Sequence, residues 1–335
     1  MSLYSCTRVV ISLSLVIITT ISGCLTENRS NSSHIGEDSS LTKIIVDDEY
    51  TSSTPGWGVT RFNSIQEAIE KSMDNSTIFV HSGVYREKIV IEKRITLIGE
   101  DANTTIISGE GSSEDVILVT DKGRVVLKGF TIRDSGYKGE YPYNEAGIDI
   151  KSDHNIICDN IFINNTCGIY TMYSDHNIIC RNKFVNNTQY GAYLYTSSDN
   201  DIIENNIFYH NKYALRIKGS AYNNVSKNIF LNNTHGLYLC CGSHDNIIFC
   251  NIFKNNEEWD ALDSFNNKYD NGSCGNFWYV FHTPEQGAYD ENGDGLVDSV
   301  FNIEGGGNVD NYPLSHPPTI DNPFYKEFKR EIEKL

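Results

Sequence analysis

Residues that could bind a divalent cation stand close to the C-terminal end of the chain. Four of them follow the pattern D-x-N-x-D-G-x-x-D over residues 290–298, with Gly295 where a tight loop must turn. Calcium binds carboxylate, amide and backbone carbonyl oxygens, which alternate positions of such a loop can direct at one ion. We therefore predict a calcium loop that locks a C-terminal cap, with the ligands Asp290, Asn292, Asp294, Asp298 and the carbonyl of Leu296.

The alternative is an acidic turn that binds no cation. A calcium loop of the helix-loop-helix type would close on a glutamate at its twelfth position, but Phe301 stands there. The pattern therefore favours a short loop bracketed by aspartates over a helix-loop-helix site.

In the middle of the chain, aromatic and cationic residues recur two positions after a small residue that itself repeats. That small residue is Gly147, Gly168, Gly191, Ala214 or Gly236. If the residue after it points inward in a strand, the following one points outward. The outward positions are then Asp149, Tyr170, Tyr193, Arg216 and Tyr238, and two residues later Lys151, Met172, Tyr195, Lys218 and Cys240.

These outward residues suit a carbohydrate. Sugar rings stack on aromatic faces, while their carboxylate or sulfate groups pair with cations. The alternative is that tyrosine simply favours half-exposed strands. We predict a glycan-binding strip made of Asp149, Tyr170, Tyr193, Tyr195, Arg216, Lys218 and Tyr238, overhung at one end by the insertion 135–146.

The elements that would position this strip follow from a repeat. Asparagines that each precede a phenylalanine by two residues are spaced by 22, 24, 22 and 23 residues: Asn160, Asn182, Asn206, Asn228 and Asn251. Periods of this length indicate a solenoid. The units are rich in Ile, Asn, Tyr and Gly, which disfavours helices, and they have no leucine framework, which argues against leucine-rich repeats.

We therefore predict an all-β fold, a right-handed parallel β-helix. Equivalent residues of successive coils would lie above one another, so inward asparagines would form hydrogen-bonded ladders. Ile157, Phe162 and their counterparts would stack in the core. Residues 64–72 begin with a capping box at Ser64 and Glu67 and predict a helix that covers the first coil. Phe324, Phe328 and Ile332 predict a C-terminal amphipathic helix that packs on the last coil.

Several motifs together resemble one family. SIQEAI, TIFVHSGVYREKIVIEKRITLIG, the Asn-rich coils, GNFW, DENGDGLVD and DNYPL are similar to the NosD-type right-handed parallel β-helix family over about residues 42 to 314. The resemblance implies an accessory role in maturing a copper enzyme. It also raises a copper site at His154, His176, Cys158 and Cys180, although extended strands would hold each histidine far from its cysteine. A disulfide between Cys158 and Cys180, or packed thiols, are the alternatives.

Enzymes of the same fold give a further alternative. The stretch ALRIKGS resembles the Arg-Ile-Lys element of polygalacturonases, but no paired aspartates and no Gly-His-Gly follow it. A hydrolase would thus lack its usual acid and base. A lyase or epimerase needs only a base and charge neutralisation, for which Asp149, Arg216 and Lys218 are candidates.

The N-terminal segment predicts export. Arg8 precedes an apolar run that ends at Gly23 and Cys24, and ISGC resembles the lipobox of lipoproteins, in which the cysteine is lipidated. Seven cysteines follow Cys24, an odd number that leaves at least one outside intramolecular disulfides. The net charge of -17 disfavours a nucleic-acid partner. The expected partners are a polysaccharide, the membrane through the lipid anchor and a possible second surface protein.

These observations predict an exported protein on the outer face of the cell membrane, or in the periplasm if the cell has an outer membrane, that binds carbohydrate without turning it over. The expected segments are a signal peptide over 1–23, a polar tether over 24–42, the β-helix over 43–278, the calcium-loop cap over 279–314 and a tail helix over 315–335.

Overall fold

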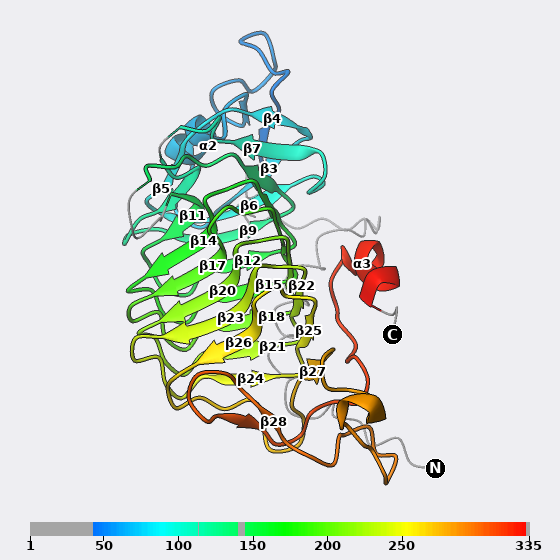
Figure 1. Cartoon of the computed structure of the whole chain (residues 1–335). Helices are drawn as coiled ribbons and strands as arrows, with labels where there is room; N and C mark the ends of the chain where they lie inside the picture. Colours follow the sequence, from blue (N-terminus) through cyan, green and yellow to red (C-terminus); the bar gives the residue numbers. More distant parts are fainter. Residues whose placement is uncertain (1–42, 113, 140–144, 333–335) are drawn as a thin grey trace, which may run out of the picture. The chain divides into compact units, whose positions relative to one another are not determined.

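The structure is a computed structural model, and it describes residues 43–112, 114–139 and 145–332. These residues form coils of three short strands, and each strand pairs in parallel with its equivalents in neighbouring coils (Figure 1). The arrangement confirms the predicted right-handed parallel β-helix. The predicted signal peptide and tether, with Cys24, lie outside the described residues.

The first sheet has ten strands and the second has nine. The strands of the first sheet are β1 (Ile44–Val46), β2 (Arg61–Phe62), β3 (Ser76–Val80), β6 (Arg94–Gly99), β9 (Arg124–Lys128), β12 (Ile156–Cys158), β15 (Ile178–Cys180), β18 (Ile202–Glu204), β21 (Asn224–Ser226) and β24 (Ile247–Phe249). Those of the second are β4 (Gly83–Tyr85), β7 (Thr105–Ser108), β10 (Thr131–Arg133), β13 (Ile161–Ile163), β16 (Lys183–Val185), β19 (Ile207–Tyr209), β22 (Ile229–Leu231), β25 (Ile252–Lys254) and β27 (Phe277–Trp278).

The third sheet has eight strands. They are β5 (Ile89–Ile91), β8 (Ile117–Val119), β11 (Ala146–Ile150), β14 (Cys167–Met172), β17 (Tyr190–Tyr195), β20 (Tyr213–Lys218), β23 (His235–Cys240) and β26 (Trp259–Asp263). A small antiparallel pair, β28 (Phe301–Asn302) and β29 (Val309–Asp310), follows, together with the helices α2 (Ile65–Lys71) and α3 (Tyr325–Ile332) and the 3-10 turn η2 (Pro284–Gln286).

A column of stacked rings fills the interior, because each coil places its aromatic residue above the last. Successive centroids are 4.4 to 5.2 Å apart and the planes are within 9° of parallel along Phe162, Phe184, Phe208, Phe230, Phe253 and Trp278. All of these residues are fully buried. The predicted aromatic core is therefore confirmed.

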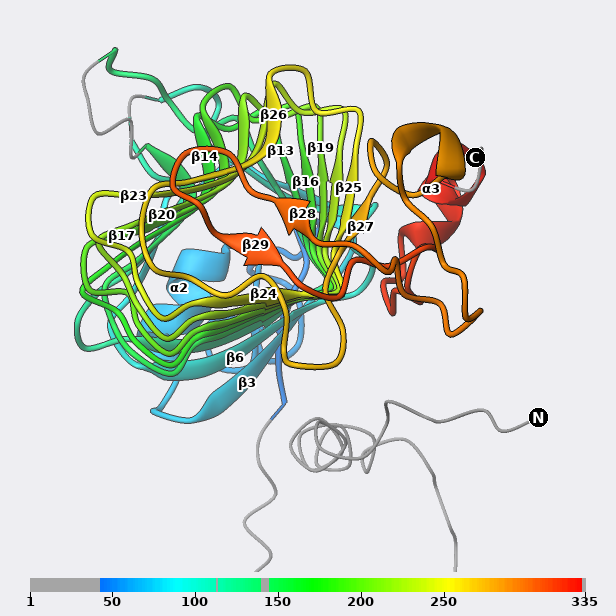
Figure 2. The same cartoon turned by 60° about the horizontal axis from the view of Figure 1, so that its bottom comes forward.

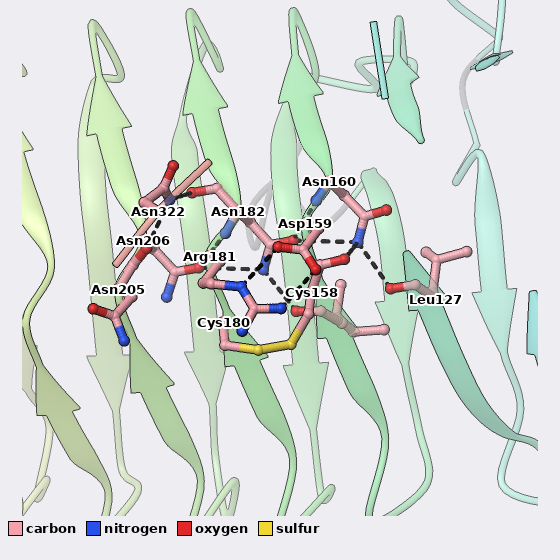
Figure 3. A network of polar contacts seen from close by, with 11 residues as sticks. Leu127, Cys158, Asp159, Asn160, Cys180, Arg181, Asn182, Asn205, Asn206 and Asn322 are labelled. Atoms are coloured by element: carbon pink, nitrogen blue, oxygen red, sulfur yellow. Dashed lines mark hydrogen bonds and ion pairs between the residues drawn. A yellow bond between two sulfur atoms is a disulfide. The ribbon is translucent and has the colours of Figure 1, made fainter. Parts of the chain in front are cut away.

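The predicted asparagine ladder runs beside this core. Asn182 Oδ1 accepts from the backbone N–H and side-chain amide of Asn160, and Asn206 Oδ1 accepts in the same way from Asn182 (Figure 3). Each amide also donates to a backbone carbonyl, as Asn182 does to Ile157 at 2.7 Å. The ladder thus satisfies turn groups that would otherwise be buried without partners.

Two motifs near the C-terminus close this ladder. The asparagine of GNFW, Asn276, continues it, and the aspartate of DNYPL, Asp310, ends it. Asp310 Oδ2 accepts from the backbone N–H of Asn276 at 2.7 Å and from Trp278 Nε1 at 2.9 Å. Gly275 has to lack a side chain, because a Cβ there would lie 1.7 Å from Asp310 Oδ1. These motifs are thus a structural cap.

The helix α2 covers the N-terminal end of the β-helix (Figure 2). Ser64 Oγ accepts from the backbone N–H of Glu67, as the predicted capping box requires. The carboxylate that binds the first turn is that of Glu87, which accepts from the N–H groups of Ile65 and Gln66 at 2.8 and 3.0 Å. A residue far along the chain therefore completes this cap.

The helix α3 is where the sequence predicted it, but it does not pack on the last coil. It lies along the outer face of the second sheet (Figure 1), where Phe328 stacks edge-on against Tyr209 at 5.0 Å and Glu327 pairs with Lys183. Its apolar residues join a cluster with the outward column Ile207, Ile229 and Ile252. The end of the β-helix instead adjoins the segment of the small β28–β29 sheet, through the bridge from Leu262 to Glu304.

Candidate functional site

The predicted strip residues occupy one row on the third sheet. Asp149 pairs with Tyr170, and Tyr193, Arg216 and Tyr238 follow in register across β11, β14, β17, β20 and β23. Their inward neighbours Ile148, Ile169, Ala192, Leu215 and Leu237 are fully buried, as predicted. A Cβ on Gly168 would lie 2.4 Å from the Gly191 carbonyl oxygen, so the repeated glycine allows this tight stacking.

Access to this row differs along its length. Asp149, Tyr170 and Tyr193 are at most 1% exposed, although they point away from the core. The two tyrosines belong to a separate cluster with Cys167 and Tyr190, because bulky side chains one coil apart cover one another. The predicted strip residues that a ligand can reach are the half-buried ones, Tyr195, Arg216, Lys218 and Tyr238. In the neighbouring row, Lys151 is also exposed and Met172 is half-buried.

Arg216 lies at the centre of the accessible part. Its guanidinium carbon is 5.0 Å from the ring centroid of Tyr193 and 5.1 Å from that of Tyr238. Nη1 donates to the hydroxyl of Tyr190 at 2.8 Å, and Nη2 approaches Cys240 Sγ at 3.5 Å. Lys218 Nζ lies 4.9 Å from the Tyr195 ring. The tyrosine rings thus hold two cations in fixed positions.

A second row on this sheet was not predicted from the sequence. Tyr190, Tyr213, His235 and Trp259 pair in register, with ring centroids 5.4, 4.3 and 4.5 Å apart. Tyr190, Tyr213 and His235 each stand directly before the repeated Gly or Ala. That position was the signal in the sequence. Burial lowers the pKa of His235, so this ring favours the neutral form.

The other end of the strip is acidic. Burial, reinforced by the neighbouring Asp115, raises the pKa of Asp149 to about 7, while Lys151 opposes that rise. Lys151 Nζ lies 3.3 Å from Asp149 Oδ2, and Asp149 Oδ1 has no hydrogen-bond partner. Burial also raises the pKa of Asp115, which accepts from the Ala146 N–H at 2.7 Å. Asp149 can therefore hold a proton near neutral pH.

The predicted calcium ligands lie together in one exposed loop. Asp290 Oδ1 accepts from the N–H groups of Gly293 and Asp294 at 2.7 and 3.1 Å, and Oδ2 accepts from Gly295 at 3.0 Å. Asn292 and Asp294 each accept from the backbone N–H two residues on, and Asp298 accepts from Glu291. These bonds shape the loop, and they leave each carboxylate with lone pairs for a cation.

The loop is tied to the segment that leads to α3. The backbone N–H of Val297 donates to Pro313 O at 2.8 Å, and that of Ser315 donates to Gly295 O at 3.1 Å. Ser315 Oγ is 3.3 Å from Asp290 Oδ2. A change in this loop would therefore reach the C-terminal segment directly.

The residues considered for copper do not fit a metal site. Cys158 and Cys180 form a disulfide, with Cα atoms 4.7 Å apart (Figure 3). His154 and His176 stack as turn residues with positive φ, their rings 5.0 Å apart. Over residues 43–112, 114–139 and 145–332, no three His, Cys, Asp or Glu side chains gather in a metal-binding geometry, the calcium loop included.

A second disulfide joins Cys250 and Cys274. Cys167, Cys240 and Cys241 are free, so the odd cysteine count does leave thiols unpaired. No helix among the described residues has the length and hydropathy to span a bilayer.

Comparison with known proteins links the chain to one family profile. The profile described as "Periplasmic copper-binding protein (NosD)" matches residues 69–283. No curated protein shows significant similarity.

Among solved structures, a mutant pectin methylesterase in complex with hexasaccharide IV has a TM-score of 0.35 and 12% identity over 60% of this chain and 79% of that chain. The carrot pectin methylesterase has a TM-score of 0.35 and 12% identity over 76% and 92%. The catalytic domain of a GH87 alpha-1,3-glucanase in complex with nigerose has a TM-score of 0.34 and 16% identity over 74% and 47%. Similarity at this level carries no argument about function.

Proposed function

The chain belongs to the family of periplasmic copper-binding proteins (NosD), and from this premise we propose an exported β-helix protein that binds acidic carbohydrate on the outer face of its third sheet. The observation that carries the proposal is the placement of Arg216 and Lys218 over tyrosine rings. Aromatic faces and fixed cations are the two features that a sugar ring with a carboxylate or sulfate group requires.

The accessible surface limits where such a ligand would sit. Tyr195, Arg216, Lys218 and Tyr238 are half-buried, whereas Tyr170 and Tyr193 lie beneath them and would support their positions. The guanidinium of Arg216 lies over the rings of Tyr190, Tyr193 and Tyr238, so it loses little side-chain entropy on binding and each new hydrogen bond contributes more. We propose that Arg216 and Lys218 bind the acid groups and that Tyr195 and Tyr238 stack on the sugars.

Binding to polygalacturonate, alginate and chondroitin sulfate tests this proposal, with calorimetry as the measurement. Lys218→Ala and Tyr238→Ala should each weaken binding by about tenfold, which corresponds to the loss of one charge-assisted hydrogen bond or one stacking contact. Lys122→Ala removes an equal charge from an exposed position outside the strip and should change nothing. Equal affinity of all four proteins for each glycan, or no binding by the unmodified protein, would overturn the proposal.

We also propose that calcium binds the loop at 290–298 and that Cys24 carries a lipid anchor. What supports calcium is the spacing of Asp290, Asn292, Asp294 and Asp298 and their position in one exposed loop. What supports the anchor is the export signal that ends at ISGC. An anchored protein would lie on the outer face of the membrane, and mass spectrometry of the N-terminal peptide checks this modification.

A second candidate function is acid-base chemistry on the same glycan. The observation that favours it is the pKa of about 7 of Asp149, which suits a group that gives or takes a proton at neutral pH. Because Asp149 is 1% exposed, this chemistry requires the side chains that cover it to move when the glycan binds. Lyase activity would release unsaturated ends, and hydrolysis would release reducing ends, from the glycans named above. Release that Asp149→Asn abolishes would establish the enzyme, and intact polysaccharide after long incubation would exclude it.

A further inference from the structure

A polar groove follows the turns that join the second sheet to the third. It has a volume of about 580 Å³ and crosses the turns before β17, β20, β23 and β26. These are the last four strands of the third sheet, and Figure 1 labels them. The middle residue of the first three turns is a buried ladder asparagine, Asn187, Asn211 or Asn233, whose side chain is occupied inside the coil. The residues on either side of it are exposed or half-exposed and line the groove.

Two columns of side chains line the groove, and each column has one residue from each turn. The backbone holds the first column outward. These residues have φ between 53° and 55°, a left-handed conformation that turns the chain sharply and that asparagine tolerates better than most residues. They are Asn186, His210, Asn232 and Asn255. Asn232 donates its amide to Glu331 of α3 at 2.6 Å and so offers mainly its carbonyl oxygen.

The second column adds hydroxyl and charged groups. Its members are Thr188, Lys212, Thr234 and Glu257. Lys212 and Glu257 carry opposite charges, so the groove has no strong net charge of its own. Amide, hydroxyl and imidazole groups both donate and accept hydrogen bonds, as a ligand rich in hydroxyl groups requires.

The spacing of the groove residues and the side chains around the groove restrict the class of ligand that it could bind. Equivalent side chains repeat at about 4.8 Å from coil to coil, close to the length of one pyranose unit in an extended chain. The second column leads directly into the aromatic row, since Tyr213 follows Lys212 and His235 follows Thr234. The strongly negative chain disfavours a nucleic acid.

We infer that this groove is a binding site for an extended uncharged glycan that lies parallel to the axis of the β-helix. The sugar hydroxyls bond to the two polar columns, and the half-exposed rings of Tyr213 and Trp259 border the sugar chain. The site is separate from the strip at Arg216 and Lys218, and it does not depend on the binding of acidic glycans there.

The test uses cellohexaose, laminarihexaose and mannohexaose in calorimetric titrations. The protein comes from a host that attaches no N-linked glycans, because Asn186 and Asn232 stand in N-x-T sequons that line the groove. At least one hexasaccharide should bind. The double variant Thr188→Val and Thr234→Val keeps the shape and removes two hydroxyls, so it should raise Kd about tenfold.

A matched pair of glycine variants controls for backbone effects. Asn186→Gly removes a groove carboxamide, whereas Asn200→Gly removes one from an exposed turn elsewhere with nearly the same φ, 58° against 53°. Glycine adopts this conformation freely, so both variants should fold. Only Asn186→Gly should weaken hexasaccharide binding, by about fivefold.

The outcomes separate this site from the strip. Hexasaccharide binding that Lys218→Ala and Tyr238→Ala leave unchanged supports the groove, whether or not these variants lose polygalacturonate. Failure of all three hexasaccharides to bind overturns the inference. So does binding that the groove variants do not affect but Lys218→Ala abolishes, because the neutral glycan would then occupy the strip.

Discussion

The outer faces of the second and third sheets belong to the same coils but differ in their side chains and in what covers them. The second presents the aliphatic column Ile207, Ile229 and Ile252, on which α3 packs. The third presents tyrosines, Arg216 and Lys218 in its later strands, and α2 contacts this sheet at its first strand, β5. Because the ladders and the ring column inside hold the coils together, the outer faces are free to differ. One serves stability, and the other is available for a ligand.

The largest expected effect lies on the covered face. Phe328→Ala would remove a ring that is 6% exposed and packs against Tyr209, so it should lower the free energy of unfolding by about 2–4 kcal/mol. Chemical denaturation measures this loss, while affinity for polygalacturonate should stay unchanged. Lost glycan binding with unaltered stability would reverse the roles assigned to the two faces.

Calcium should strengthen the attachment of α3 to the second sheet, because the predicted calcium loop is hydrogen-bonded to the segment that leads to α3. With free calcium at a hundred times its Kd, the expected gain in stability is about 2.7 kcal/mol. Thermal unfolding with calcium and with chelator measures it. Asp294→Asn removes a ligand charge and should abolish most of the difference, whereas Asp270→Asn, outside the loop, should preserve it. An equal calcium effect in both variants would place the ion elsewhere.

The third sheet should make stability depend on pH. The pKa of Asp149 is about 7 in the folded protein and near 3.8 when exposed, so its contribution is fully present below pH 3.8 and is lost as pH rises through 7. Asp149→Asn removes this loss and should stabilise the protein at pH 8 by about 1–2 kcal/mol relative to the unmodified chain. Unfolding curves at pH 5 and pH 8 provide the comparison. A variant that loses stability equally at both values would show that the carboxylate is well satisfied when charged.

The smallest expected effect on stability is that of removing the Tyr238 ring on the third sheet. Tyr238→Ala should change the free energy of unfolding by about 1 kcal/mol or less, because the side chain is half-exposed. Its effect on glycan affinity should be larger than its effect on stability, which is the opposite of the result expected for Phe328→Ala. Denaturation and calorimetry on the same two preparations give both values.

The parts of the candidate site that periodicity governs could be predicted from the sequence. The row Asp149, Tyr170, Tyr193, Arg216 and Tyr238 lies in register because stacked coils place equivalent residues above one another. Its burial could not be predicted in this way. The spacing gives the direction of a side chain relative to its own sheet, but it does not say how far the neighbouring rings cover it.

Contacts between distant residues could not be predicted either. The bond from Glu87 to the first turn of α2 and the packing of α3 on the second sheet depend on which surfaces meet after the coils have stacked. The tyrosine row before the repeated small residues was visible in the sequence. It was missed because side chains alternate in a regular strand, so the residue two positions before an inward isoleucine should also point inward. The strands of this sheet depart from that alternation. Gly168 and Ile169 both face the core, and Cys167 lies on the outer side.

The sequence by itself determined the β-helix, the ladder of asparagines and the order of residues along each row, because a repeat of 22 to 24 residues encodes contacts between like positions. Only the tertiary structure decided which outward residues are accessible, where α3 lies and that a polar groove borders the aromatic row. These features arise where unlike segments meet, and no repeat relates one such segment to the other.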